Sequence, residues 1–240
     1  MNIEEFIGGS LRAGTVNHLF GIFNLAMKAR GFEYLVFSLM TDHPSIGLRA
    51  QHAVLCSYPE NWMRHYAENN YEKIDPVRNE LTNADAPVLW ASLQRRQTLT
   101  PEQDLCLREA EVAGLKQGIA IPLRGPGNTL AGLGAASRGN ADLGPENLAC
   151  VRILTRQFYD CYISMHSKSI PVRQPLTSRE LQVGRLYSSG APRAQIGAAL
   201  GISLSGVKFH LDNIRVKMGT PTLRQAITRA QSLGLLCAQN

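Results

Sequence analysis

The stretch LTSRELQVGRLYSSGAPRAQIGAALGISLSGVKFHLDNIRVKMG (residues 176–219) determines the fold of the C-terminal part of the chain. It opens with a capping box, in which Thr177 accepts a hydrogen bond from a free backbone N–H and Glu180 reaches back to the capping residue. Gly190 suits the left-handed position that follows a helix end. Residues 177–190 therefore predict one helix with both ends defined.

Three more helices are expected after this one. Pro192 opens a short helix, Gly201 supplies the turn after it, and its inner face is expected to hold Ile196, Ala199 and Leu200. Ser203 caps a third helix, whose apolar stripe consists of Val207, Leu211, Ile214 and Met218. A fourth helix is expected to start at Thr220-Pro221 and to end at Gly234, with inward-facing Leu223, Ile227, Ala230 and Leu233.

The outer face of the third helix is polar and partly basic. It presents Ser205, Lys208, Asp212 and Arg215. A short helix, a glycine turn and a helix with such a face form the pattern of a helix-turn-helix, whose second helix enters the major groove of DNA. The alternative is a small helical bundle in which Lys208 and Asp212 form only an i,i+4 surface pair.

The charge distribution favours DNA as the partner. Residues 176–240 hold eight basic and two acidic residues, and this net charge of +6 equals that of the entire chain. The first 175 residues are therefore neutral overall. A neutral body with a basic end is expected where only the end meets a polyanion such as double-stranded DNA.

Residues 176–236 resemble the DNA-binding output domain of LuxR-type transcription regulators. The resemblance rests on LTSRE (176–180), Gly190, the run from Ile196 to Ser203, VKFHLDNI (207–214) and Lys217-Met218. It implies that Lys208 and Asp212 contact base edges. It also implies that Arg215 and Lys217 contact phosphates.

The sequence departs from the LuxR-type pattern at three positions. Gly184 stands where the family has a core leucine, Gly206 where threonine is common, and Gln195 where glutamate is usual. Each interior glycine is expected to cost about 1 kcal/mol relative to alanine. We therefore expect the domain to fold, with reduced stability or weaker DNA binding.

The residues before position 166 mix helical and strand patterns. Helices are expected at residues 15–30, 59–69, 76–83 and 145–165, with another from the capping box Thr100-Pro101-Glu102-Gln103. Strands are expected at residues 32–40, 52–58, 118–123 and 130–137, and the last two flank the turn RGPGN to form an antiparallel hairpin. This order predicts an α/β sandwich, with a central antiparallel sheet between helices, followed by the all-α four-helix domain.

Aromatic and acidic residues cluster in the middle of this first part. Tyr58, Trp62 and Tyr66 follow one another at intervals of four, so they share a helix face or its entry. Asp75-Pro76 and Trp90 come next. An aromatic pocket with a few polar groups suits a small amphipathic ligand. On the residues alone, the alternative is an ordinary aromatic core in which Asp75 caps a helix.

The same part resembles the acyl-homoserine-lactone-binding domain of LuxR-type regulators. SYPENWMRHYAENNYEKIDPV (57–77) follows the signature of that domain, and Trp90 and Gly118 fall at the expected distances beyond it. The resemblance implies that Trp62 donates its indole N–H to the lactone carbonyl, Asp75 accepts the amide N–H, and Tyr58 donates to the amide carbonyl.

The resemblance also implies the walls of the head-group site. Tyr66 and Trp90 would enclose the head group, and Gly118 would leave room. One departure concerns a serine or threonine hydroxyl that the family offers from a later strand. In LAGLGAAS (130–137) the best-aligned residue is Gly134, and Ser137 lies on a neighbouring register. We therefore expect either a different acyl chain or a ligand other than an acyl-homoserine lactone.

The two resemblances divide the chain into domains. Residues 1–165 are expected to form the ligand-binding and dimerisation domain, and residues 176–240 the DNA-binding domain. Between them, HSKSIPVRQP (166–175) is polar and contains two prolines, as expected of a linker.

Other classes of protein fit the sequence less well. The apolar runs are too short to span a bilayer, and the acidic start MNIEEF differs from a secretory signal. The scattered cysteines Cys56, Cys106, Cys150, Cys161 and Cys237 suggest a reduced, cytoplasmic protein without a metal site. Nucleophile-elbow, nucleotide-binding and metal-site motifs are absent from the sequence, so we expect no enzymatic activity and no cofactor other than the signal.

The leading interpretation is a ligand-gated regulator in which a small autoinducer binds the first domain and a homodimer binds a two-fold related DNA site. The alternative is an orphan regulator that senses no ligand, or an anti-activator, acting by heterodimerisation with related regulators. A phosphorylation-driven response regulator is disfavoured, because no aspartate follows the strand at residues 32–40 at the required place.

Overall fold

The computed structural model describes residues 1–43, 46–96, 98–125, 129–167 and 176–236. The chain divides into two compact units, one with residues 1–42, 49–124 and 130–166 and the other with residues 43–48, 125–129 and 167–240. Two features expected from the sequence lie outside the described residues. They are most of the linker, residues 168–175, and the hairpin turn at residues 126–128.

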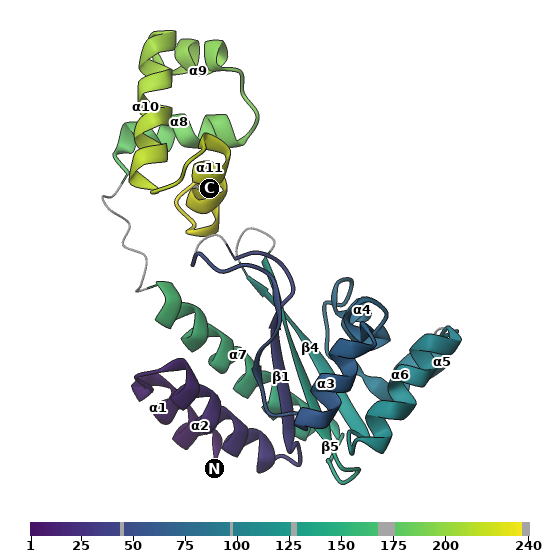
Figure 1. Ribbon diagram of the computed structural model, residues 1–240. Coiled ribbons are helices and arrows are strands. Elements are labelled where there is room, and N and C mark those ends of the chain that lie inside the picture. The colour runs from purple at the N-terminus through teal and green to yellow at the C-terminus, as the bar shows by residue number, and fades with distance from the viewer. Residues whose placement is uncertain (44–45, 97, 126–128, 168–175, 237–240) are drawn as a thin grey trace. The chain divides into compact units, whose positions relative to one another are not determined.

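The first unit is built on a five-stranded sheet with the strand order β2-β1-β5-β4-β3 (Figure 1). The strands are β1 (Tyr34–Leu39), β2 (Gln51–Cys56), β3 (Val88–Leu89), β4 (Gln117–Gly125) and β5 (Thr129–Ser137). β1 pairs antiparallel with β2 and β5, and β3 pairs antiparallel with β4. The four expected strands are confirmed, whereas the two-residue β3 is too short for a periodic pattern and was not expected.

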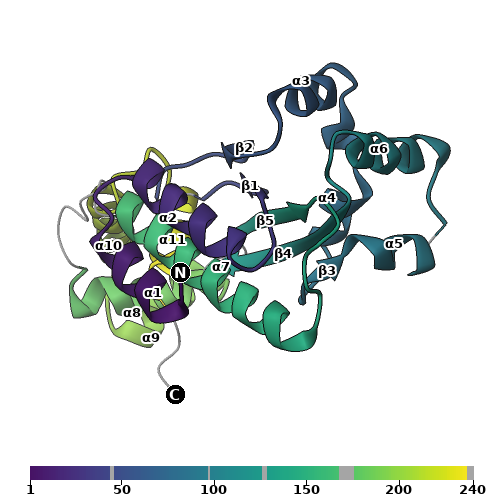
Figure 2. The same cartoon turned by 90° about the horizontal axis from the view of Figure 1, so that it is seen from below.

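Helices cover both faces of this sheet, which confirms the α/β sandwich (Figures 1 and 2). One face carries α1 (Ile3–Arg12), α2 (Val16–Lys28) and α7 (Pro145–Ser167). The other carries α3 (Glu60–Glu68), the 3-10 turn η1 (Tyr71–Lys73), α4 (Pro76–Leu81), α5 (Trp90–Arg96) and α6 (Pro101–Val112). No helix in the described ranges is both long and apolar enough to cross a membrane.

An aromatic core fixes α2 and α7 to the first face of the sheet. The rings of Phe23 and Phe158 stack with centroids 4.4 Å apart, and Phe37 of β1 meets Phe158 edge-on at 5.2 Å. All three side chains are fully buried. Burying each of these side chains stabilises the folded protein by about 1.5–3 kcal/mol, so this face of the sheet is occupied by the hydrophobic core. The opposite face of the sheet is therefore the one available for a ligand site.

Residues 176–236 form four helices: α8 (Ser178–Ser188), α9 (Arg193–Leu200), α10 (Leu204–Lys217) and α11 (Leu223–Ser232). The capping box of Thr177 and Glu180 is present at α8, and Ser203 caps α10. Gly190 and Gly201 have φ angles of 87° and 64°, which explains the glycines after α8 and α9. The expected four-helix arrangement is confirmed.

Two details of these helices were predicted wrongly. The fourth helix begins at Leu223 and not at Thr220, because Thr222 is the residue whose hydroxyl accepts the Gln225 backbone N–H, at 3.3 Å. Ala199 is exposed. The inner face of α9 holds Gly197 instead, where an added Cβ would come within 2.8 Å of the Ile202 carbonyl oxygen. The backbone of the turn after α9 therefore packs directly against Gly197.

The missing side chain at Gly184 is replaced in the core by a leucine from the C-terminal end of the domain, Leu236. Gly184 is buried, and a Cβ added there would lie 2.8 Å from Cδ2 of Leu236 and 3.3 Å from Cδ1 of Ile214. The Leu236 side chain thus fills the space that a larger residue at position 184 would occupy. Filling this space removes the cavity, so the cost of Gly184 is limited to its backbone entropy.

Candidate functional site

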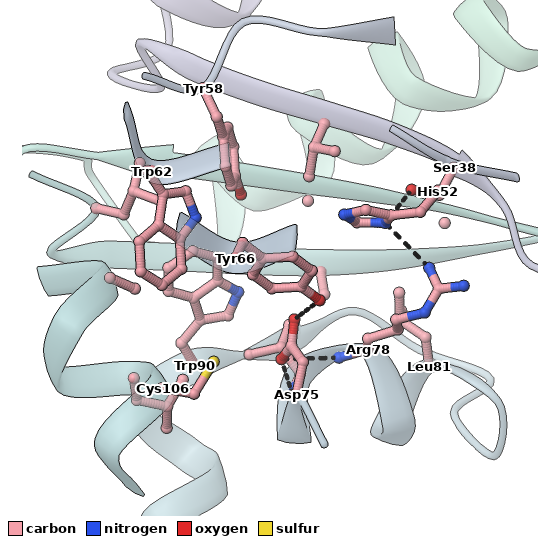
Figure 3. A pocket seen from close by; sticks show the side chains of 18 of the residues that line it. Ser38, His52, Tyr58, Trp62, Tyr66, Asp75, Arg78, Leu81, Trp90 and Cys106 are labelled. Carbon is pink, nitrogen blue, oxygen red and sulfur yellow. Dashed lines mark hydrogen bonds between the residues drawn. The ribbon is translucent and has the colours of Figure 1, made fainter. Parts of the chain in front are cut away.

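A cavity in the first unit lies between the sheet and the helices α3, α4 and α6 (Figure 3). It contains about 670 Å³ of space free of protein atoms, part of it open to solvent. Most of its wall is apolar, with Val36, Met40, Val77, Leu81, Leu107 and Leu115 among the lining residues. A few polar groups on an apolar wall are typical of a small-molecule site.

Three of the expected ligand-binding residues come from α3 and its entry. Trp62 and Tyr66 lie one turn apart on α3 and are buried, while Tyr58 precedes the helix. The rings of Trp62 and Tyr66 meet edge-on, with centroids 5.8 Å apart. Figure 3 shows the polar ends of Tyr58, Trp62 and Asp75 directed toward the same space. The structure thus brings these residues together around the cavity.

Asp75 combines a structural role with a place in the cavity wall. Its Oδ1 caps α4 by accepting the backbone N–H groups of Val77 at 2.8 Å and Arg78 at 3.3 Å. Its Oδ2 accepts the Tyr66 hydroxyl at 2.9 Å. Burial raises the pKa of Asp75, and these hydrogen bonds together with the nearby Arg78 charge oppose that rise. The helix-cap interpretation and the ligand-site interpretation of Asp75 are therefore compatible.

Trp90 brings a buried donor without a partner to the cavity. Its indole Nε1 is buried and has no hydrogen-bond acceptor among the described residues. An unpaired buried N–H costs about 1–3 kcal/mol, which a bound ligand with an oxygen acceptor would recover. Trp90 lines the cavity as expected, and its indole nitrogen is a donor that no described protein group satisfies.

Gly118 makes room for Trp90 rather than for the ligand. Gly118 does not line this cavity, but together with Trp90 it lines a neighbouring one. A Cβ added at Gly118 would lie 2.2 Å from both Cδ2 and Cε2 of Trp90, which is far inside van der Waals contact. The expected room at position 118 is therefore taken by the indole, and Gly118 acts on the cavity only through Trp90.

Replacing Gly118 with alanine is expected to push the Trp90 ring out of its place. Overpacking of this kind costs about 1–3 kcal/mol, and the displaced indole would also narrow the cavity. The measurement is the melting temperature of the variant, together with Trp fluorescence. Gly114→Ala is not a suitable control because its φ is 94°. Gly21→Ala is the control, because a Cβ there meets nothing within 4 Å and alanine inside α2 is expected to raise the melting temperature slightly. An unchanged melting temperature for Gly118→Ala would contradict the tight Trp90 contact.

The serine or threonine hydroxyl that the family offers to its ligand from the strand β5 is absent at position 134, which is a glycine. Gly134 lines the cavity, and a Cβ added there would lie 2.9 Å from Val36 Cγ1 and 3.0 Å from the Tyr58 hydroxyl. Ser137 is fully buried elsewhere, where its Oγ lies 3.4 Å from the Gln117 amide oxygen. The Tyr58 hydroxyl therefore lies beside the space that a side chain at residue 134 would occupy.

Sequence reasoning missed three polar residues of the cavity: Ser38, His52 and Arg78. They come from β1, β2 and α4, so no local spacing connects them. His52 Nδ1 lies 3.1 Å from the Ser38 hydroxyl and 3.2 Å from Arg78 Nη1. The only sequence signal was the presence of a histidine and an arginine within segments that otherwise look like ordinary strand and helix.

The expected DNA-contacting residues on α10 divide into two groups. Ser205, Lys208 and Asp212 are exposed, and the Arg215 side chain is 38% exposed and 4.0 Å from Asp212. Lys217 is different, because its side chain is only 16% exposed and its Nζ lies 2.7 Å from Oε2 of Glu180. The Lys217 ammonium is thus bound to a carboxylate of its own domain, and Lys217 does not share the exposed surface of Ser205, Lys208 and Asp212.

Comparison with known proteins identifies relatives for both units. The model of the autoinducer binding domain matches residues 15–162, and the model of bacterial regulatory proteins of the luxR family matches residues 174–230. The HTH-type quorum-sensing regulator RhlR of Pseudomonas aeruginosa is 27% identical over 226 residues, covering 91% of this chain and 89% of RhlR. An HTH-type transcriptional regulator of Sinorhizobium fredii is 26% identical over 209 residues, which are 86% of this chain and 64% of that longer protein.

A solved structure has the same fold over nearly the whole chain. The crystal structure of SdiA from Escherichia coli superposes with a TM-score of 0.72 at 22% identity and covers 98% of each chain. Of the two sequence relatives above, one is named a transcriptional regulator and the other a quorum-sensing regulator, both of HTH type.

Proposed function

Since the chain belongs to the LuxR-family regulators that carry an autoinducer-binding domain, we propose that it is gated by an acyl-homoserine lactone or a closely similar amide signal. Its function as a ligand-responsive, DNA-binding transcription regulator of quorum sensing follows from that membership and from its relatives. The chemical class of the signal is inferred from the cavity.

The arrangement around Asp75 carries this proposal. A secondary amide needs one acceptor for its N–H and one donor for its carbonyl, since a buried polar group left unpaired costs about 1–3 kcal/mol. The Asp75 carboxylate supplies the acceptor and the Tyr58 hydroxyl supplies the donor, both on the cavity wall. The indole N–H of Trp62 is assigned to a second carbonyl, that of the lactone.

Trp90 and Tyr66 complete the head-group end of the cavity in this proposal. Trp90 contributes the unpaired indole N–H as a further donor for a ligand oxygen. Tyr66 contributes its ring as a wall, and its hydroxyl holds Asp75 in place through the 2.9 Å hydrogen bond. The apolar remainder of the wall suits an acyl chain.

For the second unit we propose that α10 enters the major groove of double-stranded DNA. Ser205, Lys208 and Asp212 face solvent and are assigned to base edges, and Arg215 is assigned to a phosphate. We leave Lys217 out of this set because of its ion pair with Glu180. Two copies of the chain are expected to bind a two-fold related site, so we also propose a homodimer. Residues 1–165 and 176–240 are proposed as the ligand-binding and DNA-binding domains.

The test of the proposed function is thermal unfolding of the purified chain with acyl-homoserine lactones of different chain length. A ligand present at 100 times its dissociation constant is expected to stabilise the protein by about 2.7 kcal/mol, and thus to raise the melting temperature by about 5 °C or more. DNA binding, measured with and without the same ligand, then shows whether the signal favours or opposes the DNA-bound state.

Each result of this test has a definite meaning. A rise with one class of chain length supports the lactone as the signal. No rise with any lactone, in a sample that unfolds cooperatively, overturns the lactone proposal. In that case the alternative of a ligand-independent regulator that forms heterodimers would be favoured. The filling of the space beside Gly184 by Leu236 removes one reason for that alternative.

A further inference from the structure

A second polar group, separate from the amide-binding residues, lies in the wall of the cavity (Figure 3). It consists of Ser38, His52 and Arg78. The His52 ring stacks on Tyr66 with centroids 5.1 Å apart and an interplanar angle of 19°. Because the Tyr66 hydroxyl bonds to Asp75, His52 lies one aromatic ring away from the proposed amide site.

An irregularity in the sheet directs His52 to this position. The register between β1 and β2 shifts between Phe37 and Leu39, which pair with Leu55 and Gln51. Three residues of β2 therefore stand opposite Ser38 alone. Within this bulge Ala53 has a left-handed φ of 50°, a conformation that costs a non-glycine residue about 1 kcal/mol or more. The Ala53 backbone N–H donates to the Ser38 hydroxyl at 3.0 Å and holds the bulge.

The neighbours of His52 determine which ring nitrogen carries the proton. Arg78 Nη1 lies 3.2 Å from His52 Nδ1, and a guanidinium can only donate. Nδ1 must therefore be the acceptor, and the proton of the neutral ring is on Nε2. Arg78 is itself held by Glu72, whose Oε1 lies 2.8 Å from Nη2.

The charges around His52 keep it neutral at physiological pH. Burial, and to a lesser extent the charge of Arg78, lower the pKa of His52 to about 4, although the charge of Glu72 acts in the opposite direction. Tyr66 and Ser38, the other groups that face the ring, are neutral hydroxyl-bearing residues. Since Arg78 is neutralised by Glu72, this part of the wall offers donors without a net charge.

The Nε2–H of His52 has no acceptor among the described residues, and His52 lines the cavity. We propose that this N–H donates a hydrogen bond to a neutral oxygen on the acyl part of the signal, so that His52 selects ligands whose chain carries an oxo or hydroxyl substituent near the amide. A neutral oxygen fits better than a carboxylate because the guanidinium of Arg78 already has Glu72 as its counter-ion. This inference rests on the proposed function, which supplies the amide that places the chain.

The test compares two ligands and three proteins. The ligands are a pair of acyl-homoserine lactones of equal chain length, one unsubstituted and one with a 3-oxo group. The proteins are the natural chain, His52→Phe, which keeps an aromatic ring against Tyr66, and His18→Phe. His18 is exposed on α2 and does not line the cavity, so it is a matched control. Dissociation constants are measured by calorimetry on the full chain.

The natural chain and His18→Phe are expected to bind the 3-oxo ligand about fivefold more tightly than the unsubstituted one, which corresponds to one neutral hydrogen bond. His52→Phe is expected to lose this preference and to bind the unsubstituted ligand at least as well as the natural chain. Equal binding of both ligands by the natural chain, or a preference that survives in His52→Phe, would overturn the role of His52 and leave the lactone proposal standing. Failure of the natural chain to bind either ligand would overturn both.

Discussion

Asp75→Asn is expected to weaken lactone binding by about a hundredfold or more, while the protein stays folded. Asparagine can still accept the Val77 backbone N–H through its carbonyl oxygen, so the cap of α4 is kept. On the cavity side, however, an NH₂ group would replace the Oδ2 that accepts the Tyr66 hydroxyl. The Tyr66 hydroxyl can turn to accept a hydrogen bond from this NH₂ group, but the ligand amide N–H would then face a donor instead of an acceptor. Loss of a charged hydrogen bond costs about 1.5–3 kcal/mol, and the unpaired groups add to that cost.

Calorimetric titration of the full chain measures this effect. The matched control is Asp85→Asn, because the Asp85 side chain is 87% exposed and its partner Arg124 lies outside the cavity. We expect Asp85→Asn to bind like the natural chain. If Asp75→Asn also bound the lactone with unchanged affinity, Asp75 would be only a helix cap and the amide would be recognised elsewhere.

Local signals in the sequence predicted most of the fold. The capping box at Thr177, the cap at Asp75 and the glycine after α8 each depend on residues a few positions apart, and the structure has all three. The α/β sandwich and the four helices of residues 176–236 followed from such signals and from periodicity. The two-residue β3 could not be predicted, because two residues show no alternation.

Contacts between distant parts of the chain account for the features that sequence reasoning did not predict. Leu236 fills the space beside Gly184, and Gly118 receives the Trp90 ring. Neither relation has a sequence spacing that a pattern could detect. The polar group of Ser38, His52 and Arg78 depends in addition on a bulge in β2. The family resemblance therefore predicted that Tyr58, Trp62, Tyr66 and Asp75 gather around one cavity, but it did not predict the second polar group in the cavity wall.

Lys217 on α10 shows the same limit of sequence-based prediction. Its position on α10 and its charge predicted a phosphate contact, but its ammonium is bonded to a carboxylate 37 positions earlier in the chain. Glu180 is only 2% exposed and also accepts the Thr177 backbone N–H at 2.7 Å. Burial alone would raise the pKa of Glu180, but Lys217 and Thr177 hold it below the ordinary value. The carboxylate is therefore ionised, buried and dependent on Lys217.

Lys217→Met is thus expected to destabilise the helices of residues 176–236 by about 3 kcal/mol, because it leaves a buried carboxylate without its counter-ion. Hydrogen exchange followed by peptide mass spectrometry on the full chain measures this locally. The backbone amides of α8 and α10 are expected to exchange about a hundredfold faster, while those of the sheet in the first unit keep their rates.

Lys208→Met is the matched control, since Lys208 lies on the same helix and is exposed. We expect this variant to exchange like the natural chain but to bind DNA more weakly, as the loss of a surface contact to DNA predicts. The two lysines of α10 would then be separated by function, one needed for stability and the other for DNA. If Lys217→Met left exchange unchanged and instead reduced the salt dependence of DNA binding, Lys217 would be a phosphate contact and its pairing with Glu180 would contribute little.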